Sequence, residues 1–75
     1  MKVIGKWSRA KGDLIVNIPK IRKVGGKRYP YKSKYLGYPD DPVSPAEVEQ
    51  DILVELKLKV KLVPTSPRGG EIREV

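Results

Sequence analysis

The sequence predicts an all-β protein: a small barrel-like or strongly bent antiparallel sheet of five to six strands, accompanied by one short helix. Between residues 52 and 62 every even position is apolar, a period-two pattern typical of a half-buried strand. Glycine-containing turns at residues 11–13 and 25–26 divide the first half into short segments. Helix-start signals occur in one segment, residues 44–51. Strands therefore dominate the predicted fold.

The first half of the chain predicts a three-stranded meander. Residues 2–9 form the first strand, residues 14–24 the second, and residues 27–36 the strand that returns after a glycine pair. Within the second strand the apolar positions change from even to odd at Pro19. Because proline lacks an N–H, this position suits a sheet edge or a bulge.

The second half begins with an acidic loop and a short helix, which together span residues 39–51. Ser44 is the expected N-cap, Pro45 suits the first helical position, and Glu47 completes a capping box. We expect about two helical turns that end near Asp51.

A long strand, residues 52–63, follows the predicted helix. Eleven residues at about 3.3 Å each reach about 36 Å, so such a strand bends around a barrel or extends to a partner. Residues 64–75 form a C-terminal tail, in which residues 71–75 are a last short strand or a frayed end. The resulting order is OB-like, although an open sheet with a covering helix and a strand-exchanged dimer predict the same order.

Length and composition indicate a single domain, residues 1–75, with a marginal core. The chain has no Cys and no His, so it lacks a disulfide framework and the usual ligands of structural zinc. A homodimer or another partner would supply additional stability. The side-chain amides are limited to Asn17 and Gln50, which indicates a thermophilic source.

No apolar run approaches the ~20 residues that span a bilayer, and the first residues have no signal-peptide core. We therefore expect a cytoplasmic protein with no membrane partner.

Positive charge is concentrated in the first half of the chain. Residues 1–38 contain eleven Lys or Arg and one acidic residue, Asp13, whereas residues 39–75 contain five basic and eight acidic residues. A basic half with interleaved aromatic residues is typical of nucleic-acid binders, and a solvated lysine-rich surface is the alternative. The predicted phosphate contacts are Lys20, Arg22, Lys23, Lys27, Arg28, Lys32 and Lys34.

Aromatic residues accompany these cations. Tyr29, Tyr31 and Tyr35 share one face of the returning strand. They either stack on unpaired bases or form the core beneath a basic exterior. Trp7 is a further candidate for stacking, and Tyr38, near a loop, is the ring most expected to be exposed.

A second basic row is predicted on the solvent side of the long strand, at Lys57, Lys59 and Lys61. Lysines on a sheet edge discourage edge-to-edge pairing, which is the interpretation we favour. The alternative is that they follow a phosphate backbone.

The sequence does not predict an enzyme. Without His or Cys it lacks the commonest general base, the thiol nucleophile and the commonest metal ligand. Asp40 and Asp41 are the only adjacent carboxylates, whereas a magnesium-dependent nuclease needs further acids that converge with them. We therefore predict no catalytic residue, no metal site, no cofactor and no small-molecule substrate.

Two segments resemble DNA-binding families. Residues 11–22, KGDLIVNIPKIR, resemble the strand motif of the AbrB/MazE swapped-hairpin family, in which a glycine-led strand runs into Ile-Pro-Lys and an Arg. This resemblance covers about a sixth of the chain and implies a dimeric transcription factor or antitoxin that uses Lys20 and Arg22 on DNA. Residues 26–37 resemble the three-stranded DNA-binding sheets at the N-termini of some integrases.

Together these features predict a protein that binds DNA or RNA mainly through phosphate contacts from a basic, tyrosine-rich hairpin, with a transcriptional or chromatin-like function. The alternative is a small protein-interaction module or assembly subunit, antitoxin-like, viral or ribosomal, whose basic hairpin binds an acidic protein. Phosphate binding would tolerate many sequences and weaken steeply with salt, whereas a protein partner would be selective.

Overall fold

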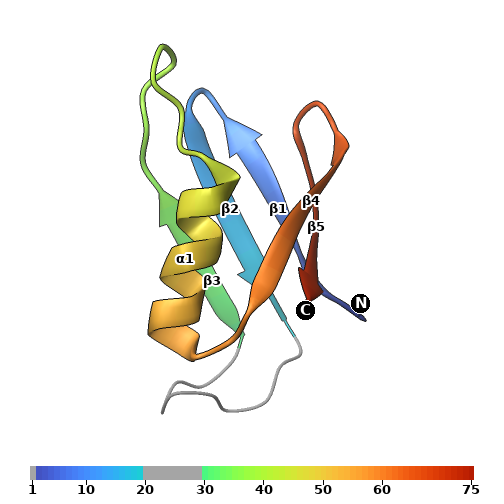
Figure 1. Ribbon diagram of the computed structural model, residues 1–75. Helices are drawn as coiled ribbons and strands as arrows, with labels where there is room; N and C mark the ends of the chain where they lie inside the picture. The colour runs from blue at the N-terminus through green and yellow to red at the C-terminus, as the bar shows by residue number, and fades with distance from the viewer. Residues whose placement is uncertain (1, 20–29) are drawn as a thin grey trace.

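The computed structural model describes residues 2–19 and 30–75, which form one antiparallel sheet with one helix packed against it (Figure 1). The elements in chain order are β1 (Lys2–Ala10), β2 (Asp13–Ile18), β3 (Tyr31–Tyr35), α1 (Pro45–Leu56), β4 (Val60–Ser66) and β5 (Gly69–Glu74). The predicted class, mostly β with one helix, is confirmed. The strand expected at residues 20–24 and the glycine pair after it lie outside the described residues.

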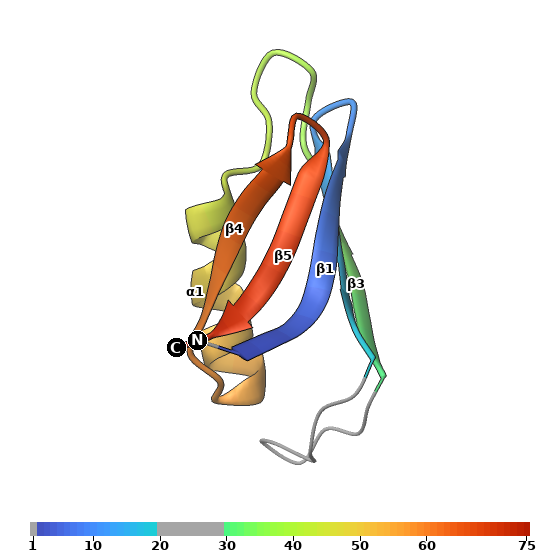
Figure 2. The same ribbon diagram turned by 90° about the vertical axis from the view of Figure 1, so that its right-hand side faces the viewer.

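The five strands follow the spatial order β3-β2-β1-β5-β4, and every neighbouring pair is antiparallel. β1 is the central strand, and among the described residues β3 and β4 are the two edges. β1 curves along its length, and α1 lies on one side of the sheet (Figure 2). The two edges do not pair with each other, so the sheet is open. The predicted barrel and its OB-like strand order are therefore not confirmed.

A tight turn joins β1 to β2, as the sequence predicts. Lys11 and Gly12 both adopt positive φ angles, 50° and 91°, and a two-residue type I′ hairpin requires this combination. Ala10 and Asp13 pair directly across the turn. The turn thereby fixes a register in which the alternate residues of β2 are buried on one face.

The helix begins where the capping signals predict. Ser44 has an extended backbone, and its Oγ accepts a hydrogen bond from the Ala46 N–H at 3.2 Å. Pro45 occupies the first helical turn, where its missing N–H is not needed. Glu47 lies in the same turn, and its charge is favourable beside the helix N-terminus.

The helix continues past the predicted end near Asp51, so the strand predicted over residues 52–63 is wrong in its first part. The buried residues of α1 are Val48, Ile52 and Leu56, and their four-residue spacing places them on one helical face. This spacing is also a multiple of two, so the apolar pattern alone does not separate helix from strand here.

The helix ends at Lys57. This residue adopts a left-handed backbone conformation with φ of 57°, and its N–H donates to the Leu53 carbonyl at 3.0 Å. After it the alternation does form a strand, since Val60 and Leu62 of β4 are buried. Among the described residues, no helix has both the length and the apolar character needed to cross a bilayer.

The C-terminal residues form an interior strand, so the last-strand alternative of the prediction is the one that the structure has, and the strand starts earlier than expected. β5 begins at Gly69, within the segment expected to be a loop, and pairs with β1 on one side and β4 on the other. Ile72 of this strand is fully buried. The end of the described chain is therefore integrated into the sheet, and the frayed alternative is wrong.

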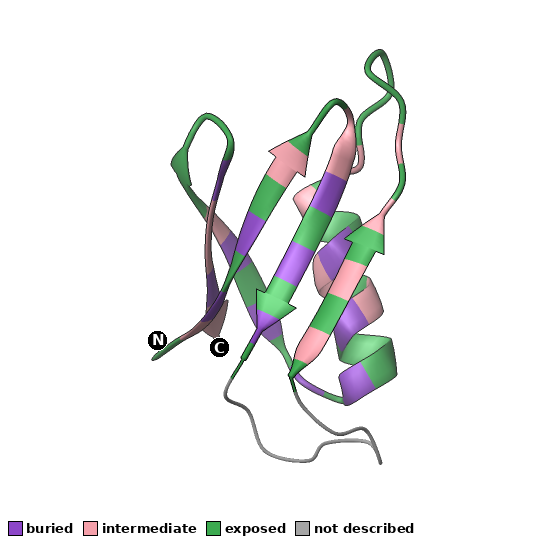
Figure 3. Cartoon of the chain, turned by 180° about the vertical axis from the view of Figure 1, so that it is seen from behind, coloured by how far each residue is buried: buried purple, intermediate pink, exposed green. Residues whose placement is uncertain are grey.

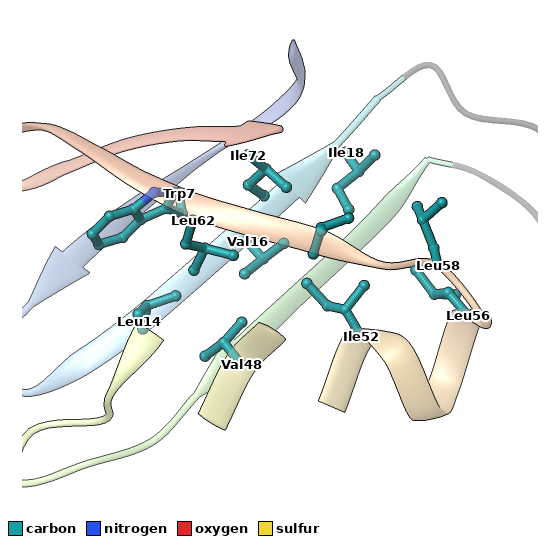
Figure 4. Packing of buried hydrophobic residues seen from close by; sticks show 11 residues of the cluster. Trp7, Leu14, Val16, Ile18, Val48, Ile52, Leu56, Leu58, Leu62 and Ile72 are labelled. Atoms are coloured by element: carbon teal, nitrogen blue, oxygen red, sulfur yellow. The ribbon is translucent and has the colours of Figure 1, made fainter. Parts of the chain in front are cut away.

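The core lies between α1 and the sheet (Figure 4). We call the sheet face toward α1 the inner face and the opposite one the outer face. The buried apolar residues of the core are Trp7, Leu14, Val16, Ile18, Val48, Ile52, Leu56, Leu58, Val60, Leu62 and Ile72. Within this core the Trp7 Nε1–H donates to the Glu71 carbonyl at 3.1 Å, which satisfies the polar atom of the buried indole.

Candidate nucleic-acid interface

The outer face presents side chains from three adjacent strands in two cross-strand rows. In register, Lys6 of β1 pairs with Asn17 of β2, which pairs with Lys32 of β3. The next row joins Ser8, Ile15 and Lys34 in the same order. Residues directly opposite each other share a sheet face, and these residues alternate with the buried ones (Figure 3).

The other half of the sheet adds charges of both signs to this face. Glu71 of β5 lies opposite Lys6, and Arg73 lies opposite Lys61 of the edge strand β4. The Arg73 Nη2 lies 2.9 Å from the Glu71 Oε1, and the Lys34 Nζ lies 3.5 Å from the Asp13 Oδ2. Lys6, Lys32 and Lys61 form no such ion pair with a described residue.

A pocket of about 640 Å³ lies on the outer face, and we call it the outer pocket. Residues of β1 and β2 line its floor, and the β4–β5 hairpin forms its wall. The lining side chains that point from the outer face or the hairpin are Lys6, Ser8, Ile15, Asn17, Thr65, Ser66, Arg68 and Glu71. It therefore combines cations, neutral polar groups, the Glu71 carboxylate and the apolar side chain of Ile15, and the remaining lining residues are Trp7, Gly69 and Gly70.

A second concavity adjoins it between the β1–β2 turn and the β4–β5 turn. Arg9, Ala10, Lys11 and Arg68 line this space of about 470 Å³, which we call the turn pocket. Arg68 is common to both pockets. The Arg9 guanidinium is already engaged, since it lies 5.7 Å from the centre of the Trp7 ring and its Nη1 donates to the Val43 carbonyl at 3.0 Å.

The helix α1 is acidic, in contrast to the basic side chains that line the two pockets. The sequence of α1 contains four acidic residues and no basic one. Two of these acidic residues reach the edge strands of the sheet: Asp51 accepts a hydrogen bond from Tyr35 of β3, and Glu49 accepts one from the Leu62 N–H of β4. Among the described residues, α1 thus carries only acidic charged side chains, whereas the outer face carries more basic than acidic ones.

The predicted phosphate contacts are divided between the described and undescribed parts of the chain. Lys32 and Lys34 lie together on the outer face of β3, as predicted. The remaining predicted contacts, together with Tyr29, lie outside the described residues: Lys20, Arg22, Lys23, Lys27 and Arg28.

The described aromatic candidates do not lie on the outer face. Tyr31 and Tyr35 pair with Ile18 and Leu14, so they face α1, and they pack partly buried against the core. Trp7 is buried, with 5% of its surface exposed. Tyr31 and Tyr35 are therefore not presented to a ligand on the outer face, and Trp7 contributes only its small exposed area to the lining of the outer pocket. Among the aromatic residues that the structure describes, the exposed one is Tyr38, at 70%, as the sequence predicts.

Tyr31 and Tyr35 take part in a hydrogen-bond chain that connects β3 to the helix. The Tyr35 hydroxyl donates to the Asp51 Oδ2 at 2.7 Å and lies 3.0 Å from the Tyr31 hydroxyl. Burial raises the pKa of Tyr35 well above its ordinary value, and the bond to Asp51 raises this pKa further. The Tyr35 phenol is therefore neutral. The hydrogen bonds from Tyr31 through Tyr35 to Asp51 attach the edge strand β3 to α1.

The second basic row predicted at residues 57–61 does not form on one strand. Lys57 ends the helix, Lys59 precedes β4, and Lys61 alone projects from the outer face of β4. The row was expected because the strand was expected to begin at residue 52. The change of structure at Lys57 separates the three lysines.

Sequence reasoning missed several outer-face residues: Lys6, Arg68 and Arg73. The polar alternation of residues 2–9 predicts that Lys6 is exposed, but it does not reveal that β1 is central and has β2 and β5 on its two sides. Arg68 and Arg73 belong to a segment that was expected to be a loop and a short end strand. Among residues 2–19 and 30–75, no three carboxylates are placed to hold a metal ion.

Comparison of the chain with known proteins gave no match to a protein-family model, to a curated protein or to a solved structure. The resemblances of residues 11–22 and 26–37 to two DNA-binding families therefore stay predictions.

Proposed function

We propose that the protein binds nucleic acid, DNA or RNA, mainly through phosphate contacts. Its binding surface would combine the outer face of the sheet with the basic segment of residues 20–29. The observation that carries the proposal is the group of outer-face lysines, Lys6, Lys32 and Lys61, that form no ion pair with a described residue. Such cations release condensed counterions when they contact phosphates, and this release supplies affinity.

The sequence that joins β2 to β3 supports the same surface. Ile18 pairs with Tyr31, so residues 20–29 connect neighbouring ends of the strands that carry Asn17 and Lys32. These ten residues contain five basic and no acidic side chains. The connection therefore contributes five cations to the sequence between two strands that carry outer-face residues.

The charge of the helix favours the outer face over the helix side. Its four acidic residues would repel phosphates, so insertion of α1 into a groove is unfavourable. Binding through the face of the sheet is the arrangement that keeps these carboxylates away from the nucleic acid.

A fluorescence-anisotropy titration tests this proposal. Labelled DNA and RNA, single-stranded and double-stranded, would be titrated at about 50 mM and about 200 mM salt. We expect binding in the micromolar range or tighter that weakens steeply between the two salt concentrations. Reversal of Lys23, Lys27 and Arg28 to Glu should abolish it with Trp7 emission unchanged, since Trp7 reports the core. Absence of binding to all four ligands at low salt would refute the proposal.

A protein-interaction module is the second candidate, and the loop before α1 favours it. Leu36 and Tyr38 are 76% and 70% exposed in this loop. The loop itself is held in place, because the Val43 N–H donates to the Gly12 carbonyl at 3.0 Å and the Gly37 N–H to Asp13 at 2.9 Å. A fixed loop with exposed apolar side chains suits contact with a protein. A variant with Leu36→Ser and Tyr38→Ser would lose such a partner and keep nucleic-acid binding.

A further inference from the structure

The outer pocket indicates which form of nucleic acid this surface would bind. The inference rests on the proposed function and concerns the conformation of the ligand. The pocket lies over the cross-strand row that contains Lys6 and Asn17. A nucleic-acid strand that contacts the outer-face lysines would therefore pass over it.

The wall of the pocket is fixed by the fold. The Arg68 carbonyl at the tip of the β4–β5 hairpin accepts a hydrogen bond from the Arg9 N–H at 2.8 Å. Gly69 allows this close approach, because a Cβ at that position would overlap the Trp7 carbonyl oxygen. Its φ of 152° is also one that other residues rarely adopt. The pocket is therefore preformed, which lowers the entropic cost of binding.

The floor of the pocket has the mixture of groups that an unpaired nucleoside needs. Ile15 is 38% exposed and offers an apolar surface to the face of a base. Asn17, beside it on β2, presents both a donor and an acceptor to the edge of the base. In a duplex the base faces are stacked and the Watson–Crick edges are paired, so neither surface is available to these residues.

Cationic side chains line both pockets, and they would contact the phosphates on either side of a nucleoside bound in the outer pocket. Lys6 and Arg68 both line the outer pocket. The Glu71 carboxylate lines it too, and Glu71 is paired with Arg73 at 2.9 Å. Arg68 also lines the turn pocket together with Lys11, which adds a third cation next to the outer pocket. The two pockets together offer one nucleoside position flanked by positive charge.

We propose that the outer pocket binds one unpaired nucleotide, with the base against Ile15 and Asn17 and the phosphates at Lys6 and Arg68. The protein is then a single-strand binder that uses an apolar and amide surface in place of the usual aromatic ring.

The test compares affinities for matched single-stranded and double-stranded oligonucleotides of about 12 nucleotides, of DNA and of RNA. Wild-type protein should bind single strands at least about tenfold more tightly than duplex. Asn17→Leu removes the amide without changing the charge, and we expect about fivefold weaker single-strand binding, since one hydrogen bond is worth about 1 kcal/mol. Duplex affinity and the salt dependence should be unchanged.

Gln50→Leu is the matched control, because it removes the other side-chain amide at an exposed position of α1. A second variant, Ile15→Ser, should weaken single-strand binding while Trp7 emission stays unchanged. Equal wild-type affinity for single and double strands would overturn the inference and leave the proposed function intact. The same holds if Asn17→Leu behaves like Gln50→Leu. No binding to any oligonucleotide would refute the proposed function itself.

Discussion

Tyr35 shows at the residue scale how one side chain can serve the sheet and the helix together. Its ring packs against the core from the inner face of β3, and its hydroxyl reaches the Asp51 carboxylate of α1 at 2.7 Å. A hydrogen bond to a charged group is stronger than one between neutral groups. Because β2 is the one strand that pairs with β3 in the described part of the chain, this bond is an important part of the attachment of β3.

The raised pKa of Tyr35 predicts a loss of stability in alkaline solution. In the unfolded chain the phenol ionises near pH 10, whereas in the folded protein burial and Asp51 keep it neutral to higher pH. The unfolded state therefore loses its proton first, and the free energy of unfolding falls as pH rises above about 10. Below that pH the residue contributes no pH dependence.

Urea unfolding followed by Trp7 fluorescence at several pH values measures this effect. Tyr35→Phe should be less stable than wild type near pH 7, because one hydrogen bond is lost, and it should lose less further stability between about pH 9 and about pH 11. Parallel pH dependences for the two proteins would show that Tyr35 is not protected in the folded state.

At the element scale, the features that depend on neighbouring residues could be predicted from the sequence, and the features that depend on tertiary packing could not. The capping signals of Ser44 and Pro45 and the Lys11-Gly12 turn depend on neighbours in sequence, and both were predicted correctly. The end of the helix depends on tertiary packing. Val54 fits the period-two pattern as well as its neighbours do, yet it is 62% exposed on the far side of α1.

Contacts between distant parts of the chain could not be read from local patterns. β5 is an interior strand because β1 pairs with it as well as β4. β4 directly precedes β5 in the sequence, whereas β1 lies at the other end of the chain, and local patterns do not reveal that pairing. The outer pocket depends on the same pairing, since the β4–β5 hairpin supplies its wall. Lys32 and Lys34 were predicted from the alternation of one strand, whereas Arg68 required knowledge of the strand order.

Glu49 connects α1 to the edge of the sheet in a way that can be tested. Its Oε2 accepts a hydrogen bond from the Leu62 N–H of β4 at 2.8 Å. An edge strand offers unpaired N–H groups to other chains, so this carboxylate occupies a position at which another strand would pair. The same bond also holds the helix against β4.

Glu49→Ala should lower the free energy of unfolding by about 1–3 kcal/mol, because the Leu62 N–H loses a charged acceptor. Glu49→Gln keeps a side-chain oxygen at this position and should lose less. Urea denaturation with Trp7 fluorescence measures both variants. If Ala and Gln have the same stability as wild type, the bond does not contribute to holding α1 on the sheet.

At the scale of the whole molecule, the protein has two chemically different sides. The helix side is acidic, and the outer face carries lysines without a described acidic partner together with a preformed pocket. The most basic segment of the sequence, residues 20–29, joins β2 to β3. Both of these strands carry outer-face side chains. This polarity is the basis of the proposed nucleic-acid interface, and it predicts that position matters more than total charge.

The most direct test of that claim compares two double variants with the same change of charge. Lys6→Glu with Lys32→Glu reverses two outer-face lysines, and Lys57→Glu with Lys59→Glu reverses two lysines near the end of the helix. Nucleic-acid affinity would be measured by anisotropy over a series of salt concentrations, with Trp7 emission as the check on folding. The outer-face variant should bind at least about tenfold more weakly, with a salt slope reduced by about 2, and the helix-end variant should stay near wild type. Equal losses in the two variants would contradict an interface on the outer face.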